Sequence, residues 1–254
     1  MQRARPVARR FCRMTPPPAG PRIAWLDRAR GVAVIGMVLF HLARDLEIFG
    51  WLPRGTTLRG GWPLFSTLVA GGFLMLSGFS LWLAHGRGIR WPAFLRRLAL
   101  LALAAGAVTL ATWIATPDRF VYFGILHALA LSAVAGLALL RLPAPALIGL
   151  AGLILLLLAR LSGPSFDHPA LWWLGLAPFP RPTLDFEPML PWFAPFLIGM
   201  ALAKLAPRRW LTRGPAAGEL PAWLGRHSLA VYLIHQPVLL ALLWTARQIA
   251  LPGG

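Results

Sequence analysis

Residues 31–50 read GVAVIGMVLFHLARDLEIFG, an apolar run that closes with four ionisable side chains. About 20 apolar helical residues cross a hydrocarbon core of about 30 Å, and the segment that begins near Leu26 is long enough to do so. Ionisable groups in such a segment are costly, so they are candidates for function by default. The four residues are His41, Arg44, Asp45 and Glu47.

The rest of the chain has the same apolar character. Its 254 residues are 57% hydrophobic and 13% charged, and the mean hydropathy is +0.65. Soluble domains carry about a quarter of charged residues. Neither an internal repeat nor a long polar linker divides the chain, so we predict an all-α, polytopic membrane bundle of about seven transmembrane helices in a single domain over residues 23–250. Further apolar segments begin near Gly61, Arg97, Phe120, Ala144, Met189 and Arg226.

The net charge of +17 follows the predicted topology. With seven spans, 18 of the 25 Lys and Arg residues fall on the side of the N-terminus and 7 on the other side. Cytoplasmic loops carry such an excess of positive charge, which predicts a cytoplasmic N-terminus and an external C-terminus. The charge therefore gives no reason to expect nucleic-acid binding.

The first 22 residues are rich in Arg and Pro and contain the single cysteine, Cys12. We expect a disordered, basic cytoplasmic tail, no disulfide and no metal site. Motifs for nucleotide hydrolysis, serine esterases, zinc proteases and dinucleotide binding are also missing from the sequence. The chemistry must therefore come from His, Asp and Arg side chains.

His41 and Asp45 are the first candidates for catalysis. On a helix that enters at Arg30, His41 lies about 16 Å deeper, and Asp45 follows at i+4 on the same face. This spacing predicts a general base, His41, with Asp45 as the carboxylate that orients it. The alternative is that the helix ends at the interface, where charged groups reach water, and we prefer this interpretation for Arg44 and Glu47.

Further candidates lie in or beside the later spans. His127 has a depth similar to that of His41, although a lone histidine can also hydrogen-bond a neighbouring helix. His235 and Gln236 precede Pro237, whose kink is an equally good structural explanation. Asp185, just outside the sixth span, could position a polar or amine-bearing acceptor, and Glu187 beside it is more readily explained as hydrated.

Arginines on the cytoplasmic side are candidates for binding phosphate. Arg28 and Arg30 precede the first span, and Arg96 and Arg97 precede the third. Guanidinium groups recognise phosphate, but Asp27 can instead pair with Arg30 at i+3 and anchor the helix. The Pro- and Trp-rich residues 162–188 should form an external interfacial anchor rather than a re-entrant cap, and the Gly and Ala clusters should form packing faces.

Five stretches together resemble one known family. They are LDRARGVAVIGMVLFHLARDLEIFG, FSTLVAGGFLMLSGFSLWL, FGILHALALS, LDFEPMLPWFAPFLIGMALA and HSLAVYLIHQPVL. In this order they are similar to bacterial relatives of the heparan-alpha-glucosaminide N-acetyltransferase catalytic domain. The resemblance implies a multi-pass protein of the bacterial cytoplasmic (inner) membrane. Such a protein moves an acyl group, acetyl in the first place, from cytoplasmic acyl-CoA to a sugar or glycan amine or hydroxyl outside.

The resemblance also implies site residues. The family pattern carries over to His41, Asp45 and His127, which we expect to take part in the reaction, and to Asp185, Trp192, His235 and Gln236, which we expect near the acceptor. The loop WLPRGTTLRGGW departs from the family, because the histidine proposed as active in the lysosomal transferase lies in this loop and no histidine occurs here. The role of His41 is thus inferred from its position. A homodimer, a proton-coupled transporter and a non-catalytic scaffold stay open as alternatives.

Overall fold

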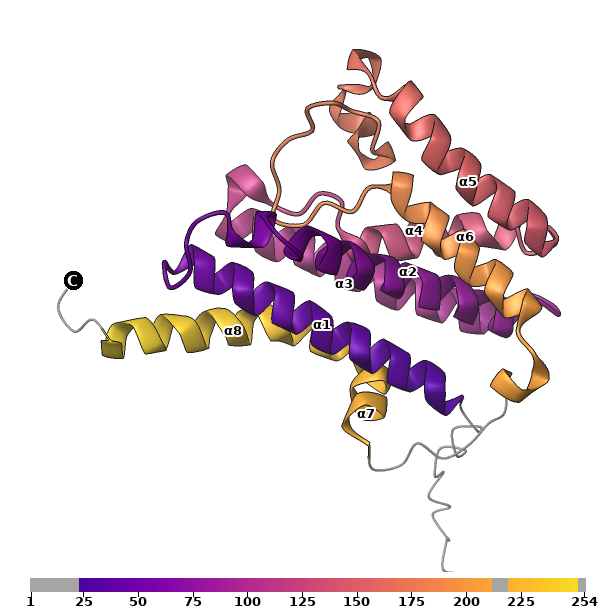
Figure 1. Ribbon diagram of the computed structural model, residues 1–254, viewed down its shortest axis with the longest axis horizontal. Coiled ribbons are helices and arrows are strands. Elements are labelled where there is room, and N and C mark those ends of the chain that lie inside the picture. The colour runs from indigo at the N-terminus through magenta and orange to yellow at the C-terminus, as the bar shows by residue number, and fades with distance from the viewer. Residues whose placement is uncertain (1–22, 212–218, 251–254) are drawn as a thin grey trace, which may run out of the picture.

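The computed structural model describes residues 23–211 and 219–250, and helices dominate this part of the chain (Figure 1). The predicted basic tail with Cys12 lies outside it. The all-α class is confirmed for the described residues, whose one β contact is an isolated bridge between Phe123 and Phe186. The α-helices are α1 (Ala24–Ile48), α2 (Trp62–His85), α3 (Trp91–Ala115), α4 (Ile125–Ala138), α5 (Ala144–Leu161), α6 (Met189–Leu205), α7 (Leu220–Arg226) and α8 (Ser228–Ala250).

Each of the predicted apolar segments contains one of the long helices. Among the described residues, α2, α3 and α8 are long and apolar enough to cross a membrane, whereas α4, α5 and α6 contribute shorter apolar stretches. Short 3₁₀ turns lie in the connections, at Thr56–Leu58, Pro117–Arg119, Pro164–Phe166, Pro169–Leu174 and Arg208–Leu211. The number of spans and the side of the N-terminus stay predictions.

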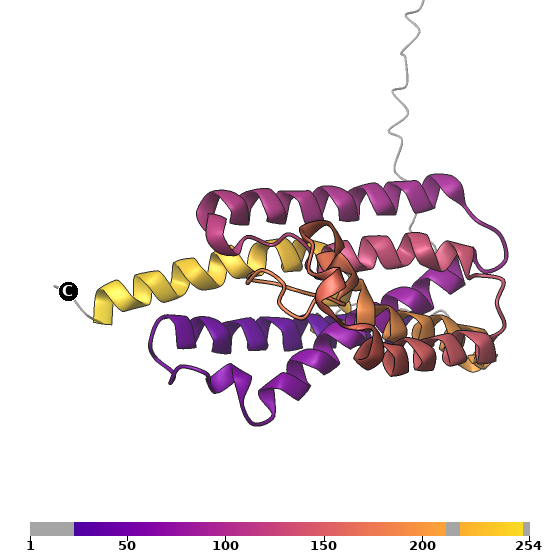
Figure 2. The ribbon, with the colours of Figure 1, turned by 90° about the horizontal axis from the view of Figure 1, so that it is seen from above.

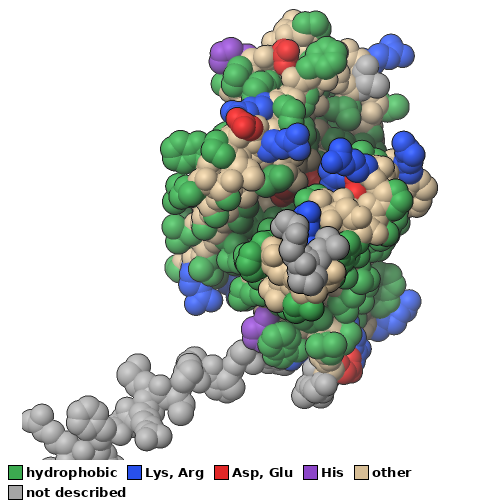
Figure 3. Space-filling model, turned by 90° about the vertical axis from the view of Figure 1, so that its left-hand side faces the viewer, with side chains coloured by type: hydrophobic (Ala, Val, Ile, Leu, Met, Phe, Trp, Pro, Cys, Tyr) green, Lys and Arg blue, Asp and Glu red, His purple; other side chains and the backbone are tan. Residues whose placement is uncertain are grey.

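The outer surface is apolar, as a lipid-facing surface has to be. Leu103 of α3, Leu156 of α5 and Ile249 of α8 are each more than 70% exposed. Seen from the end that carries residues 49–61 and the end of α8, basic and acidic side chains gather at that end between hydrophobic flanks (Figure 3). Exposed apolar surface on this scale marks an interaction site, and here the partner is membrane lipid.

Glycines allow α2 and α6 to pack at backbone distance in the core. A Cβ added to Gly78 of α2 would lie 2.0 Å from the carbonyl oxygen of Phe196, and one added to Gly199 of α6 would lie 1.9 Å from that of Met75. The predicted packing role is therefore confirmed for Gly78. In the cluster of residues 149–152, Ala151 is buried in the core, whereas a Cβ on Gly149 or Gly152 would meet nothing within 4 Å.

A short helix that hydropathy does not predict, α7, packs across the start of α1. A Cβ on Gly31 would lie 1.8 Å from the carbonyl oxygen of Pro221, and one on Gly225 would lie 1.8 Å from that of Asp27. From above, α8 continues beyond α7 and extends away from the bundle beside α1 (Figure 2). The two reciprocal glycine contacts therefore hold α7 under one end of the bundle.

Candidate active site

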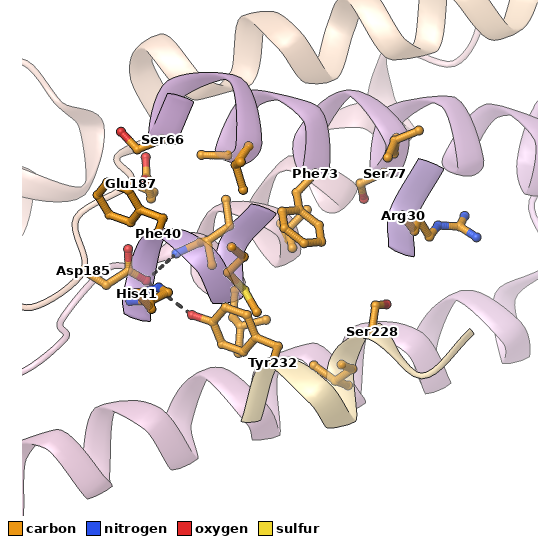
Figure 4. A pocket seen from close by; sticks show the side chains of 18 of the residues that line it. Arg30, Phe40, His41, Ser66, Phe73, Ser77, Asp185, Glu187, Ser228 and Tyr232 are labelled. Carbon is orange, nitrogen blue, oxygen red and sulfur yellow. Dashed lines mark hydrogen bonds between the residues drawn. The ribbon is translucent and has the colours of Figure 1, made fainter. Parts of the chain in front are cut away.

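A cavity of about 730 Å³ lies between the helices. This volume is typical of small-molecule sites. His41, Ser66, Asp185 and Glu187 gather at one end, and Arg30 and Ser228 lie at the other (Figure 4). The wall between the two ends is largely apolar and includes Met37, Val69, Phe73, Leu126 and Leu129.

Asp185 and Glu187 form the acidic end of this cavity, and they come from the segment predicted as an interfacial anchor. Asp185 Oδ2 accepts hydrogen bonds from the Ile125 amide at 3.0 Å and from the Tyr232 hydroxyl at 3.4 Å. The Glu187 amide donates to the Phe123 carbonyl at 3.2 Å. Residues 184–187 therefore form part of the cavity wall, and the amides of Leu184 and Glu187 are hydrogen-bonded to protein carbonyls.

Both carboxyl groups hold their protons more tightly than usual. Burial raises the pKa of Asp185 to about 6, although the hydrogen bonds from Ile125 and Tyr232 act in the opposite direction. Burial, followed by the charge of Asp185, raises the pKa of Glu187 to about 9. Trp192, predicted beside the acceptor, makes a side-chain hydrogen bond with Glu187 and does not line the cavity.

His41 lines the cavity and lies against a second histidine that does not. The ring centroids of His41 and His235 are 5.0 Å apart. His235 Nδ1 is 2.6 Å from the Tyr232 carbonyl oxygen. Because a carbonyl only accepts, Nδ1 carries the hydrogen, and the buried Nε2 has no partner among the described residues. His235 is thus a neighbour of the predicted base rather than a residue of the cavity wall.

Asp45 is paired with Gln236 and not with His41. Asp45 is 1% exposed, and Gln236 Nε2 donates to Oδ1 at 2.8 Å and to Oδ2 at 3.0 Å. The expected hydrogen bond between Asp45 and His41 does not form in the described chain. The i+4 spacing puts both side chains on one face of α1, but α8 also packs on that face and supplies a nearer donor.

His127 lies in a separate cavity of about 370 Å³ with Thr109, Trp113 and Tyr122. Its Nδ1 accepts from the Gly124 amide at 3.2 Å, so the neutral ring carries its hydrogen on Nε2, which is 3.3 Å from Thr109 Oγ1. Both nitrogens are engaged at the start of α4. The structure does not bring His127 and His41 into one cavity, and it gives His127 a capping contact.

Only two of the four predicted phosphate-binding arginines line the large cavity. Arg30 and Arg97 line the cavity, whereas Arg28 and Arg96 do not. Arg30 contacts Asp27 at 3.0 Å and donates to Ser80, which confirms the i+3 pair. Arg28 makes two 2.6 Å hydrogen bonds to Glu219. Arg226, the last residue of α7, lines the same end as Arg30 and was not among the predicted site residues.

The expectation that Glu47 reaches water is wrong. Glu47 is 7% exposed and accepts from the Gly55 amide at 2.6 Å, the Thr57 amide at 3.1 Å, the Thr57 hydroxyl at 2.8 Å and Arg44 at 3.0 Å. It fastens residues 49–61 to the end of α1. Thr57 and Leu58 of this loop then line the cavity.

One family model matches this chain over residues 22–237, that of the heparan-alpha-glucosaminide N-acetyltransferase catalytic domain. No curated protein and no solved structure matches the chain.

Proposed function

The chain belongs to the heparan-alpha-glucosaminide N-acetyltransferase catalytic family, a family of membrane acetyltransferases, and from this premise we propose a specific reaction. The protein moves an acyl group, acetyl in the first place, from cytoplasmic acyl-CoA to an amine or hydroxyl of an external sugar or glycan. The observation that carries the proposal is the cavity with a cationic end at Arg30 and a histidine at the other end.

The cationic end suits the donor. Arg30, Arg97 and Arg226 line it, and guanidinium groups bind phosphate by charge-assisted hydrogen bonds. His41 follows Arg30 by 11 residues on α1, which corresponds to about 16 Å along a helix. A thioester on a long flexible arm, anchored by its phosphates, could therefore present its carbonyl near His41.

The opposite end suits the transfer step. The nitrogen or oxygen of the acceptor attacks the thioester carbon while His41 takes a proton from that atom. The leaving thiolate then receives this proton from His41. In an alternative sequence, His41 itself carries the acyl group between donor and acceptor. Asp45 serves this step by holding Gln236, and with it the neighbouring His235, against α1.

The proposal includes seven spans with the N-terminus in the cytoplasm of a bacterial cell. In this orientation Arg30 and α7 lie on the cytoplasmic side, where acyl-CoA is made. His41, Asp185 and Glu187 lie nearer the external side, where a glycan acceptor is met. The excess of Lys and Arg in the loops on the side of the N-terminus supports this orientation.

The test is acetyl transfer in sealed membrane vesicles, with radiolabelled acetyl-CoA as donor and membrane glycans as acceptors. We expect His41→Ala to lower transfer by roughly 10²- to 10⁴-fold at matched protein level, which is the usual contribution of a positioned base. The control is His168→Ala, since His168 is exposed and lies outside the cavity. Wild-type activity in His41→Ala would remove His41 from the reaction.

A further inference from the structure

Two carboxyl groups lie at the acidic end of the cavity, and the one cationic side chain that lines this end among the described residues already pairs with another carboxylate. Asp185 and Glu187 are two residues apart and line the same end. The other titratable or charged groups that line this end are His41 and Arg44 of α1 and Tyr232 of α8. Arg44 is engaged by Glu47 and Thr57. Two carboxyl groups so placed do not both ionise readily, so one of them retains its proton.

The hydrogen bonds decide which group is ionised. Asp185 Oδ2 accepts from the Ile125 amide and the Tyr232 hydroxyl, and Ile125 begins α4, whose N-terminus favours negative charge. Glu187 accepts a hydrogen bond from the indole of Trp192, and its Oε2 is buried without a partner among the described residues. Asp185 is therefore the carboxylate and Glu187 the carboxylic acid.

A neutral carboxylic acid has a hydrogen to donate, and the Glu187 side chain belongs to the cavity wall. His41, the proposed base, lines the same end (Figure 4). An acyl group attacked beside His41 develops negative charge on its oxygen, and a donor there lowers the barrier.

We propose that Glu187 is held as a neutral acid and that its carboxyl group donates a hydrogen bond to the carbonyl oxygen of the acyl group during transfer. This inference rests on the proposed function. As the acceptor atom bonds to the thioester carbon, the carbonyl π electrons move to oxygen and the Glu187 hydroxyl stabilises them. When the carbonyl re-forms, the C–S bond breaks and the thiolate takes the proton that His41 removed from the acceptor. Glu187 keeps its own hydrogen throughout.

Two substitutions distinguish a donor from a charged carboxylate. Glu187→Gln retains an N–H donor and an acceptor for Trp192, so we expect it to keep most of the acetyl transfer activity. Glu187→Leu removes the donor and should lower transfer by roughly 10²- to 10³-fold, the usual cost of one oxyanion donor. Equal loss in both variants, with acetyl-CoA binding retained, would show that the ionised carboxylate is needed and would overturn the proposal, as would full activity in Glu187→Leu.

Infrared spectroscopy tests the same inference without turnover. The wild-type protein should show the carbonyl band of a protonated carboxylic acid at neutral pH, absent from Glu187→Gln and lost as pH rises through about 9. Addition of acetyl-CoA should shift this band to lower frequency, since the acid then donates to the thioester carbonyl. An ionised Glu187 at neutral pH, or a band that acetyl-CoA does not shift, overturns the inference. Absence of acetyl transfer by the wild type, with the shift present, would instead contradict the proposed function.

Discussion

At the scale of single residues, the ionisable groups of FHLARDLEIFG serve different purposes although they lie within one helical turn or two. His41 lines the cavity, Asp45 pairs with Gln236, and Glu47 binds the following loop. The buried Glu47 carboxylate accepts hydrogen bonds from four donors. Its replacement is costly, because these donors then lose an ionised acceptor. The sequence spacing alone suggests a shared role for His41 and Asp45, and their partners show separate ones.

Glu47→Gln tests this distinction. The amide keeps the size of the side chain but replaces an acceptor oxygen by a second donor group, which then faces N–H or O–H donors of residues 55 and 57. We expect a loss of about 1–3 kcal/mol in stability, measured as a lower thermal-unfolding midpoint in detergent. The control is Glu219→Gln, whose ion pair with Arg28 is exposed and should contribute little. Equal midpoints for the two variants would contradict the structural role of Glu47.

Arg96 and Arg97 form a second matched pair, because they are adjacent in α3 and only Arg97 lines the cavity. If Arg97 meets a phosphate of CoA, Arg97→Gln should weaken CoA binding by roughly tenfold, which corresponds to the loss of about one charge-assisted hydrogen bond. Arg96→Gln should bind CoA as the wild type does. Calorimetry on purified protein measures both, and a larger effect from Arg96 would place the donor elsewhere.

At the scale of helices, α7 is the element that closes the cationic end. It carries Gly225 and Arg226 to the cavity and packs on α1 at backbone distance through Gly31 and Gly225. Only residues without a side chain allow such an approach. The position of Arg226 therefore depends on a contact between segments that are far apart in the sequence, since Gly31 meets Pro221 and Gly225 meets Asp27.

Gly225→Ala should displace α7, because the added Cβ would lie 1.8 Å from the Asp27 carbonyl oxygen. We expect a lower unfolding midpoint together with weaker CoA binding. Gly152→Ala in α5 is the control, since a Cβ there meets nothing within 4 Å and alanine favours a helix by roughly 0.5–1 kcal/mol over glycine. A Gly225→Ala protein with unchanged stability and CoA affinity would show that α7 moves without consequence.

At the scale of the whole molecule, the orientation in the membrane decides which end of the cavity meets which substrate. The charge distribution predicts that the connection between α2 and α3 is cytoplasmic and that between α3 and α4 external. Reporter fusions after Gly88 and after Arg119 should therefore report inside and outside, respectively. If both report the same side, the seven-span topology fails, and with it the assignment of donor and acceptor ends.

Hydropathy determined the helical class and the positions of the long helices. A membrane-spanning helix needs about 20 consecutive apolar residues, and such a run can be recognised in the sequence of that segment alone. Hydropathy also located His41 and Asp185, since ionisable groups are conspicuous in so apolar a sequence. It did not predict α7, because the whole helix has only seven residues, LPAWLGR, with a proline in its first turn, and is too short to show an apolar period.

The partners of the ionisable groups were decided only by the tertiary structure. Helical spacing limits which face of α1 Asp45 occupies, but the donor it meets, Gln236, is 191 residues away in the sequence. In the same way, His127 and His41 have similar predicted depths. His127 nevertheless accepts a hydrogen bond from the Gly124 amide at the start of α4, whereas His41 lines the large cavity. A sequence determines which segments enter the membrane, because that depends on each segment's own transfer from water. Which polar groups meet there depends on how helices from distant parts of the chain pack, and no local pattern records it.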